Sequence, residues 1–133
     1  MIRSGEEAHR RKAIGMLLQD HVRDEILRLN PELTSEDVKS TPPCVNGEDL
    51  QLSDKANRIV GDFLFECKSS KRGYKATYQA IAQSEAHTNG RLEKVNVAIV
   101  NDPIKKTPLA VMTLPNFLKL CRDIFLEEGN KLQ

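Results

Sequence analysis

The chain has 133 residues, 29% of them are charged, and the formal net charge is +1. This length suits one domain with its own core and is short for two, so a single domain over residues 1–133 is expected. A balance so close to neutrality excludes a globally basic or acidic protein, and any surface for a polyanion must be local. No apolar run of 18 residues and no apolar signal region near residue 1 occur, which predicts a cytoplasmic protein without a membrane span.

The three cysteines, Cys44, Cys67 and Cys121, are odd in number and far apart. No CxxC motif occurs that would indicate a zinc or redox site. Reduced thiols in a cytoplasm are therefore expected.

The first predicted element is a helix from about Glu6 to Leu29, because apolar residues recur there at spacings of three and four. Pro31 ends this helix. Thr34 and Asp37 then have the spacing of a capping box, which predicts one further helical turn through residue 38. The apolar stripe of the helix consists of Ile14, Leu17, Leu18, Val22, Ile26 and Leu29.

Two strands are predicted in the middle of the chain. Residues 40–43 (STPP) form a loop, because prolines cannot donate hydrogen bonds to a sheet. Residues 49–52 then alternate and predict the first strand, and residues 53–58 read as a connecting turn. Gly61 precedes the second strand, residues 63–68 (FLFECK), whose apolar beginning indicates a strand that becomes buried.

The second half of the chain predicts a helix, two strands and a closing helix. The helix covers Tyr74–Thr88 and stops at Asn89-Gly90. Residues 95–100 (VNVAIV) are β-rich enough for an interior strand, and residues 109–113 form the last strand. Pro115 suits the first turn of the closing helix. Its inward residues are expected to be Phe117, Leu118, Cys121, Ile124 and Phe125. The order helix, two strands, helix, two strands, helix predicts a mixed α/β fold in three layers.

The chemistry of the chain is concentrated in Asp49, Glu66 and Lys68. Side chains alternate on a strand, so Glu66 and Lys68 lie side by side at roughly 6–7 Å between alpha carbons. An acid from a neighbouring strand would complete a pair of carboxylates, and such a pair selects Mg²⁺ or Mn²⁺. A structural ion pair between Glu66 and Lys68 is an equally open reading of this spacing.

Two further acids lie near this cluster. Asp62 shares the strand face of Glu66, but four residues of strand separate their alpha carbons by about 13 Å, too far to clasp one ion without a bulge. Glu48 points away if Asp49 points inward, which favours a solvated residue or a hydrogen-bond anchor.

Asp49, sixteen intervening residues and then Glu66-Cys67-Lys68 resemble the PD-(D/E)XK nuclease superfamily. The chain is more closely similar to small phage- and prophage-encoded nuclease-like proteins described as Holliday-junction-resolvase-like, over residues 33–42, 47–50, 52–53, 66–68 and 83–86. The likeness spans roughly Leu17 to Leu120. The chain departs from the family pattern in three ways. Glu48 stands in place of the usual proline, Asp62 is an extra acid, and no glutamate of the first helix is assigned as the further acid that some relatives have. Asp20 and Asp24 are the available candidates for that acid.

The resemblance implies a restriction-endonuclease-like three-layer core of αβββαβ type, with a central mixed sheet flanked by helices. Asp49, Glu66 and the backbone carbonyl of Cys67 would bind Mg²⁺ or Mn²⁺. Lys68 would contact the attacking water or the scissile phosphate. Gln83 matches the position from which a glutamine commonly lines such sites.

Local cations and aromatic residues follow the proposed cluster in the sequence. Lys71, Arg72 and Lys75 are the cations expected to contact DNA phosphates, and such contacts position the backbone without reading its sequence. Tyr74 and Tyr78 lie one helical turn apart and would serve either packing or base stacking.

The sequence therefore predicts a Mg²⁺-dependent endonuclease that cuts branched or junction DNA as a homodimer, without a small-molecule cofactor, in a bacterial host cell if the gene belongs to a phage or prophage. One alternative is a non-catalytic nucleic-acid-binding or scaffold protein that retains the fold. Another is a restriction-like or nicking nuclease acting on ordinary duplex DNA.

Overall fold

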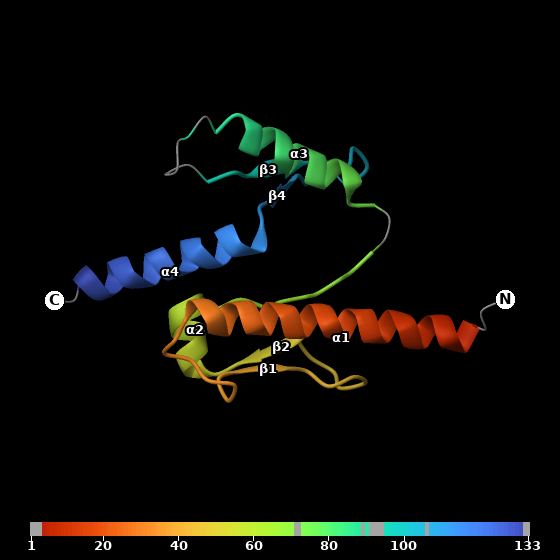
Figure 1. The fold of residues 1–133 in the computed structure, drawn as a ribbon, viewed down its shortest axis with the longest axis horizontal. Helices are drawn as coiled ribbons and strands as arrows, with labels where there is room; N and C mark the ends of the chain where they lie inside the picture. Colours follow the sequence, from red (N-terminus) through yellow and green to blue (C-terminus); the bar gives the residue numbers. More distant parts are fainter. Residues whose placement is uncertain (1–3, 71–72, 89, 91–94, 106, 132–133) are drawn as a thin grey trace. The chain divides into compact units, whose positions relative to one another are not determined.

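The computed structural model describes residues 4–70, 73–88, 90, 95–105 and 107–131 (Figure 1). These residues form four helices and four short strands. The elements in chain order are α1 (Ser4–Leu29), β1 (Val38–Ser40), β2 (Leu50–Leu52), α2 (Asp54–Val60), α3 (Lys75–Ala86), β3 (Ala98–Val100), β4 (Leu109–Val111) and α4 (Leu114–Lys131).

The fold is mixed α/β, as predicted, but the strands form two separate antiparallel sheets, β1–β2 and β3–β4. The prediction of one central mixed sheet is wrong for the described residues. Each strand is only three residues long, and residues 63–68 are extended without forming a regular strand. The chain divides into two compact units. The first consists of residues 1–69 and 118–133, and the second consists of residues 70–117. The single-domain organisation stays a prediction.

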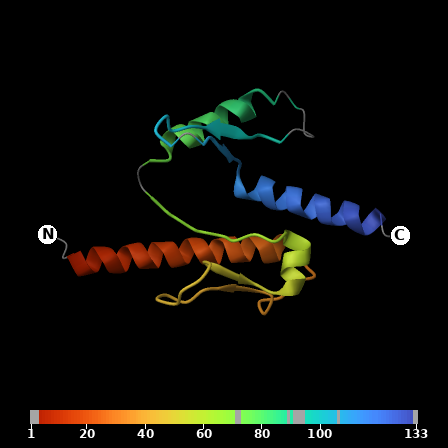
Figure 2. The ribbon, with the colours of Figure 1, turned by 180° about the vertical axis from the view of Figure 1, so that it is seen from behind.

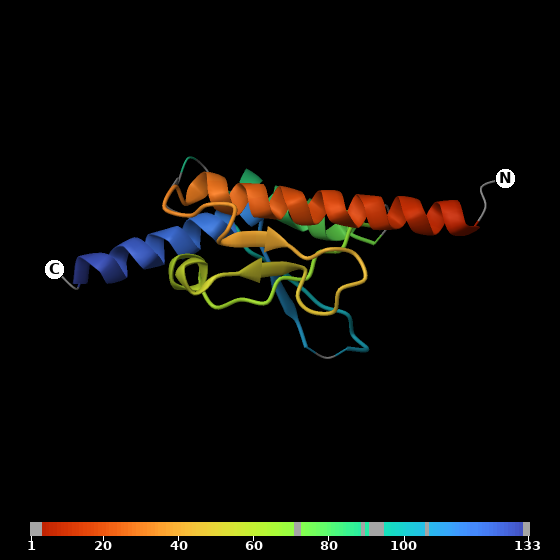
Figure 3. The same ribbon diagram turned by 90° about the horizontal axis from the view of Figure 1, so that it is seen from below.

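In the first unit, α1 lies along the β1–β2 sheet (Figure 3). The predicted helix over residues 6–29 is confirmed. The sheet pairs Val38 with Leu52 and Ser40 with Leu50. Ile26 of α1 and Val38 of β1 are fully buried, and Leu50 is nearly so. Removal of these apolar side chains from water holds the helix on the sheet.

The predicted capping contact is confirmed, since Asp37 Oδ2 accepts a hydrogen bond of 2.9 Å from the Thr34 backbone N–H. The predicted helical turn through residue 38 is wrong in part, because residues 35–37 form a turn and Val38 begins a strand. That strand is β1, which the sequence did not predict because so short a strand has no clear alternation.

The connection after β2 is a helix, so the prediction of a turn at residues 53–58 is wrong. Ser53 caps α2, and its hydroxyl accepts a hydrogen bond of 3.1 Å from the Ala56 N–H. Ala56, Ile59 and Val60 lie at helical spacing and are all buried. Burial of this short apolar face overrides the polar, turn-like composition of the segment.

In the second unit, the β3–β4 hairpin lies along α3 (Figure 2). The predicted helix over residues 74–88 and the two predicted strands are confirmed, with shorter strands than expected. Ala98 and Ile81 are buried, whereas the side chain of Ile99 is 68% exposed. The expectation that residues 95–100 form an interior strand is therefore wrong, because one face of β3 is open.

The closing helix α4 carries Pro115 in its first turn, as predicted. Leu118 and Cys121 are buried, but Ile124 is 51% exposed, so its predicted inward orientation is wrong. Within the first unit, Arg122 binds the Glu32 carboxylate through two N–H groups, one of them at 2.7 Å. No helix among the described residues is long and apolar enough to cross a membrane.

Candidate metal centre

Asp49 directly precedes β2 and is held between two extended segments. Its carbonyl oxygen accepts a hydrogen bond of 2.9 Å from the Thr41 N–H, and its own N–H donates to the Phe65 carbonyl at 3.2 Å. The first bond continues the β1–β2 pairing by one residue, since Ser40 pairs with Leu50. The second bond attaches residues 63–68 to the other side of the same chain segment.

The side chain of Asp49 also contacts this attached segment. Its Oδ2 accepts a hydrogen bond of 2.5 Å from the backbone N–H of Cys67, the residue between Glu66 and Lys68. Asp49 and Cys67 are half-buried, whereas Glu66 and Lys68 are exposed. The structure therefore brings Asp49 against the segment that carries Glu66 and Lys68, while the roles of these side chains stay predictions.

The environment of the Cys67 thiol reflects both carboxylates. Partial burial raises the pKa of the Cys67 thiol, and the negative charges of Asp49 and Glu66 raise it further. The thiol is consequently protonated at neutral pH and is a poor metal ligand. The role of the Cys67 backbone carbonyl as a metal ligand stays a prediction.

Residues 63–68 reach this position through a glycine. Gly61 ends α2 with φ at 121°, and a Cβ built there would lie 2.4 Å from Cε2 of the Phe63 ring. The rings of Phe63 and Phe65 meet edge to face at 6.1 Å. The expectation that this segment becomes buried is wrong, because Leu64 is 78% exposed and Phe63 is 41% exposed.

The predicted donor set suits a hard divalent cation. Two carboxylates and a carbonyl supply only oxygen, and Mg²⁺ needs one or two protein carboxylates because it keeps several waters. A carboxylate offers about four lone-pair sites, so the bond from Cys67 leaves capacity on Asp49. In the described part of the chain, however, no group of three or more His, Cys, Asp or Glu side chains is arranged to hold a metal.

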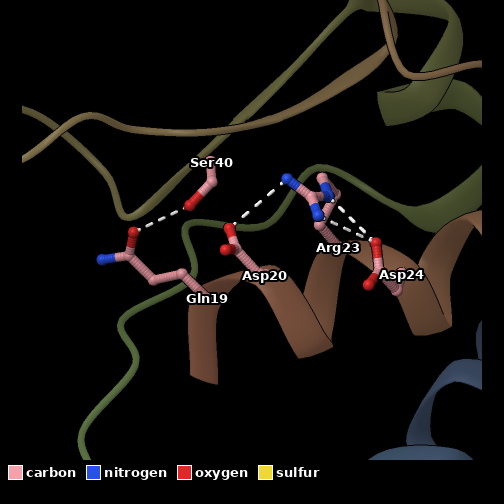
Figure 4. A network of polar contacts seen from close by, with 5 residues as sticks. All are labelled: Gln19, Asp20, Arg23, Asp24 and Ser40. Atoms are coloured by element: carbon pink, nitrogen blue, oxygen red, sulfur yellow. Dashed lines mark hydrogen bonds and ion pairs between the residues drawn. The ribbon is translucent and has the colours of Figure 1, made fainter. Parts of the chain in front are cut away.

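The acids of the first helix have a different partner (Figure 4). Arg23 pairs with Asp20 at 3.3 Å and with Asp24 at 3.0 Å. On the same helix, Gln19 Oε1 accepts a hydrogen bond of 2.9 Å from the Ser40 hydroxyl. Arg23 therefore competes with any metal for Asp20 and Asp24. The link from Gln19 to Ser40 has no signal in the sequence, because the two residues are far apart and polar.

The remaining predicted site residues follow Ser69. Gln83 and Lys75 lie on α3 in the second unit and are exposed. Lys71 and Arg72, the other two predicted DNA contacts, lie outside the described residues. Their proposed roles stay predictions.

In the second unit, an open pocket of about 740 Å³ lies between the first turn of α3 and the β3–β4 turn, and both apolar and polar residues line it. Its lining includes Thr77, Lys105 and Thr107. Near this helix end, Tyr74 is 42% exposed and Tyr78 is 76% exposed. Neither tyrosine belongs to the core, which leaves flank packing and base stacking as their open roles.

No protein-family model, curated protein or solved structure matches the chain. The resemblance to PD-(D/E)XK nucleases therefore depends on the residues of this chain alone. The contact of Asp49 with Cys67 is the geometric observation that bears on it most directly.

Proposed function

We propose that the protein is a Mg²⁺-dependent DNA endonuclease whose centre is formed by Asp49, Glu66 and Lys68. The observation that carries this proposal is the hydrogen bond from the Cys67 N–H to Asp49 Oδ2. This bond brings the acid that directly precedes β2 against the segment Glu66-Cys67-Lys68, in which an acid and a lysine are separated by one residue. If Glu66 and Lys68 formed only a structural ion pair, that pair would not require Asp49 beside them.

Each residue has a role that its chemistry supports. Asp49 and Glu66 would hold the cation through carboxylate oxygens, together with the Cys67 carbonyl. A bound Mg²⁺ or Mn²⁺ ion supplies Lewis acidity and lowers the pKa of a coordinated water. Lys68 would orient that water and offset the charge that develops on the phosphate. The resemblance to the family also assigns a site role to Gln83.

Branched or junction DNA is the proposed substrate, and Lys71, Arg72 and Lys75 are its proposed phosphate contacts. This choice follows the likeness to Holliday-junction-resolvase-like proteins. One chain carries one such centre, so paired cuts in a symmetric junction require a homodimer. The proposed location is the cytoplasm. It is the cytoplasm of a bacterial host cell if a phage or prophage encodes the protein.

A second candidate is a non-catalytic nucleic-acid-binding protein with the same fold. In that protein the Asp49–Cys67 hydrogen bond would only attach residues 63–68 beside β2, without a metal. A restriction-like or nicking enzyme for ordinary duplex is the remaining enzymatic reading.

Cleavage assays distinguish these functions. Labelled four-way, flap and linear duplex DNA would be incubated with wild type and with Glu66→Ala, with and without Mg²⁺. We expect metal-dependent cutting of the junction, and a loss of about 10²-fold or more in rate when Glu66 is removed, because a ligand that stabilises transition-state charge is lost.

The matched control is Asp62→Ala, which removes an exposed acid four residues earlier in the same segment. This variant should cut at nearly the wild-type rate. Binding of DNA without cutting by wild type would select the non-catalytic protein instead. Equal cutting of junction and linear duplex would select the duplex nuclease.

A further inference from the structure

Thr41 lies directly after β1 and is buried, with only 5% of its surface exposed. Thr41 donates two hydrogen bonds to the chain segment opposite, residues 48–49. Its hydroxyl donates to the Glu48 carbonyl at 2.5 Å, and its backbone N–H donates to the Asp49 carbonyl at 2.9 Å. No sequence pattern singled out Thr41, because it stands in a predicted loop before two prolines.

These two acceptors belong to the two peptide groups that flank the alpha carbon of Asp49. A peptide group is planar, so its orientation is fixed when its carbonyl is held. Because Thr41 holds both carbonyls, this one residue constrains the backbone dihedral angles of Asp49. Because side-chain directions follow the backbone, Thr41 constrains where the Asp49 carboxylate points.

The sequence around Thr41 explains why it adopts this position. The residue before a proline is biased toward extended backbone, and Pro42 follows Thr41. Thr41 therefore continues the direction of β1 past its last paired residue, Ser40. Its N–H then faces Asp49 across the extended ladder.

We propose that Thr41 is a positioning residue for the metal-binding carboxylate of Asp49, an inference that rests on the proposed function. Thr41 touches neither metal nor DNA. It acts by aiming Asp49 at the segment that carries Glu66 and Lys68. Residues that orient a metal ligand typically change metal affinity about 10–100-fold when they are replaced.

The experiment compares Thr41→Val, which removes the hydroxyl, with Thr41→Ser, which retains it. Two quantities are measured in the full chain: the dissociation constant for Mn²⁺ by calorimetry, and the hydrogen-exchange rate of the Cys67 amide by NMR. Thr41→Val should weaken Mn²⁺ binding about tenfold or more and accelerate exchange of the Cys67 amide. Because Thr41→Ser keeps the hydroxyl, its Mn²⁺ dissociation constant and its Cys67 exchange rate should both stay within about twofold of wild type.

Thr34→Val is the matched control. It removes a hydroxyl that accepts from the Glu36 N–H at 3.3 Å in the same unit, away from Asp49. This variant should leave both measured quantities unchanged. If Thr41→Val does not fold, Thr41→Ala removes the hydroxyl with a smaller side chain and is measured in its place.

Two results would overturn the inference, and they are distinguishable. If wild type binds Mn²⁺ and a folded hydroxyl-free variant binds it equally well, Thr41 has only a structural role, and the proposed function stands. If wild type binds no Mn²⁺, the proposed metal-dependent function fails, and the role of Thr41 fails with it.

Discussion

The thiol of Cys67 is partly removed from water and lies near two acidic side chains. Burial, then the charges of Asp49 and Glu66, raise the pKa of the Cys67 thiol. Thiolate is the nucleophile, so the alkylation rate of Cys67 should still be rising with pH above the ordinary thiol pKa of 9.0, where the rate of an unperturbed thiol levels off. The isosteric change Asp49→Asn removes one negative charge, and we expect the pKa of Cys67 to fall toward, but not below, that ordinary value.

This prediction is checked by the pH dependence of iodoacetamide labelling, followed for each cysteine by mass spectrometry. The exposed Cys44 is the internal control and should label at the same rate in both proteins. Labelling of Cys67 that rises at the same pH in wild type and Asp49→Asn would show that the Asp49 charge does not act on this thiol.

At the scale of elements, the link from α2 to residues 63–68 depends on Gly61. Its φ of 121° is unfavourable for any residue with a Cβ, and the added carbon would displace the Phe63 ring. Gly61→Ala should therefore lose the edge-to-face contact of Phe63 with Phe65 in addition to straining the backbone. The contact is worth about 0.5–1.5 kcal/mol in the free energy of unfolding.

Gly47 provides the control, since its φ is 129° and a Cβ there would meet nothing within 4 Å. Gly47→Ala should cost only the backbone strain, about 1–3 kcal/mol. Urea denaturation measures both variants, and Gly61→Ala should be less stable than Gly47→Ala by about 1 kcal/mol. Equal stabilities would mean that the Phe63 ring contributes nothing to holding this segment.

The elements differ in how far the sequence could predict them. α1 and α4 are long, and their apolar periodicity outweighs local ambiguity. Residues 53–58 predict a turn because Ser, Asp, Lys and Asn dominate them. The helix Asp54–Val60 depends instead on tertiary burial of Ala56, Ile59 and Val60. Residues 63–68 have strand-like composition, but Leu64 finds no apolar surface and remains exposed.

The candidate site was predictable only in its titratable members. The spacing of Asp49, Glu66 and Lys68 suggested a shared place in the fold, and the Asp49–Cys67 contact agrees with it. The hydrogen bonds of Thr41 to the Glu48 and Asp49 carbonyls were not predictable, because backbone acceptors are common to every residue. Hydrogen bonds to backbone groups are specified by the register of β1 and β2, which the sequence did not reveal.

For the whole molecule, the central prediction is that two copies cooperate on one junction. If each protomer carries one centre of Asp49 and Glu66, a heterodimer of wild type and Glu66→Ala can cut one strand only. On a plasmid that extrudes a cruciform, paired cuts within one binding event yield linear DNA, whereas a single cut yields a nicked circle. Excess Glu66→Ala, exchanged into the dimers by co-refolding, should therefore convert the product from linear to nicked DNA.

Glu66→Ala alone should yield neither product, and excess Asp62→Ala should leave the linear product unchanged. A monomeric enzyme predicts a different result, because added inactive protein would then slow both cuts equally and leave the product ratio unchanged at equal consumption of the plasmid. The ratio of nicked to linear DNA thus reports whether two centres act together, and it does so independently of how fast each centre cuts. The mixed sample should sediment as a dimer, and a monomer would contradict the proposed homodimer directly.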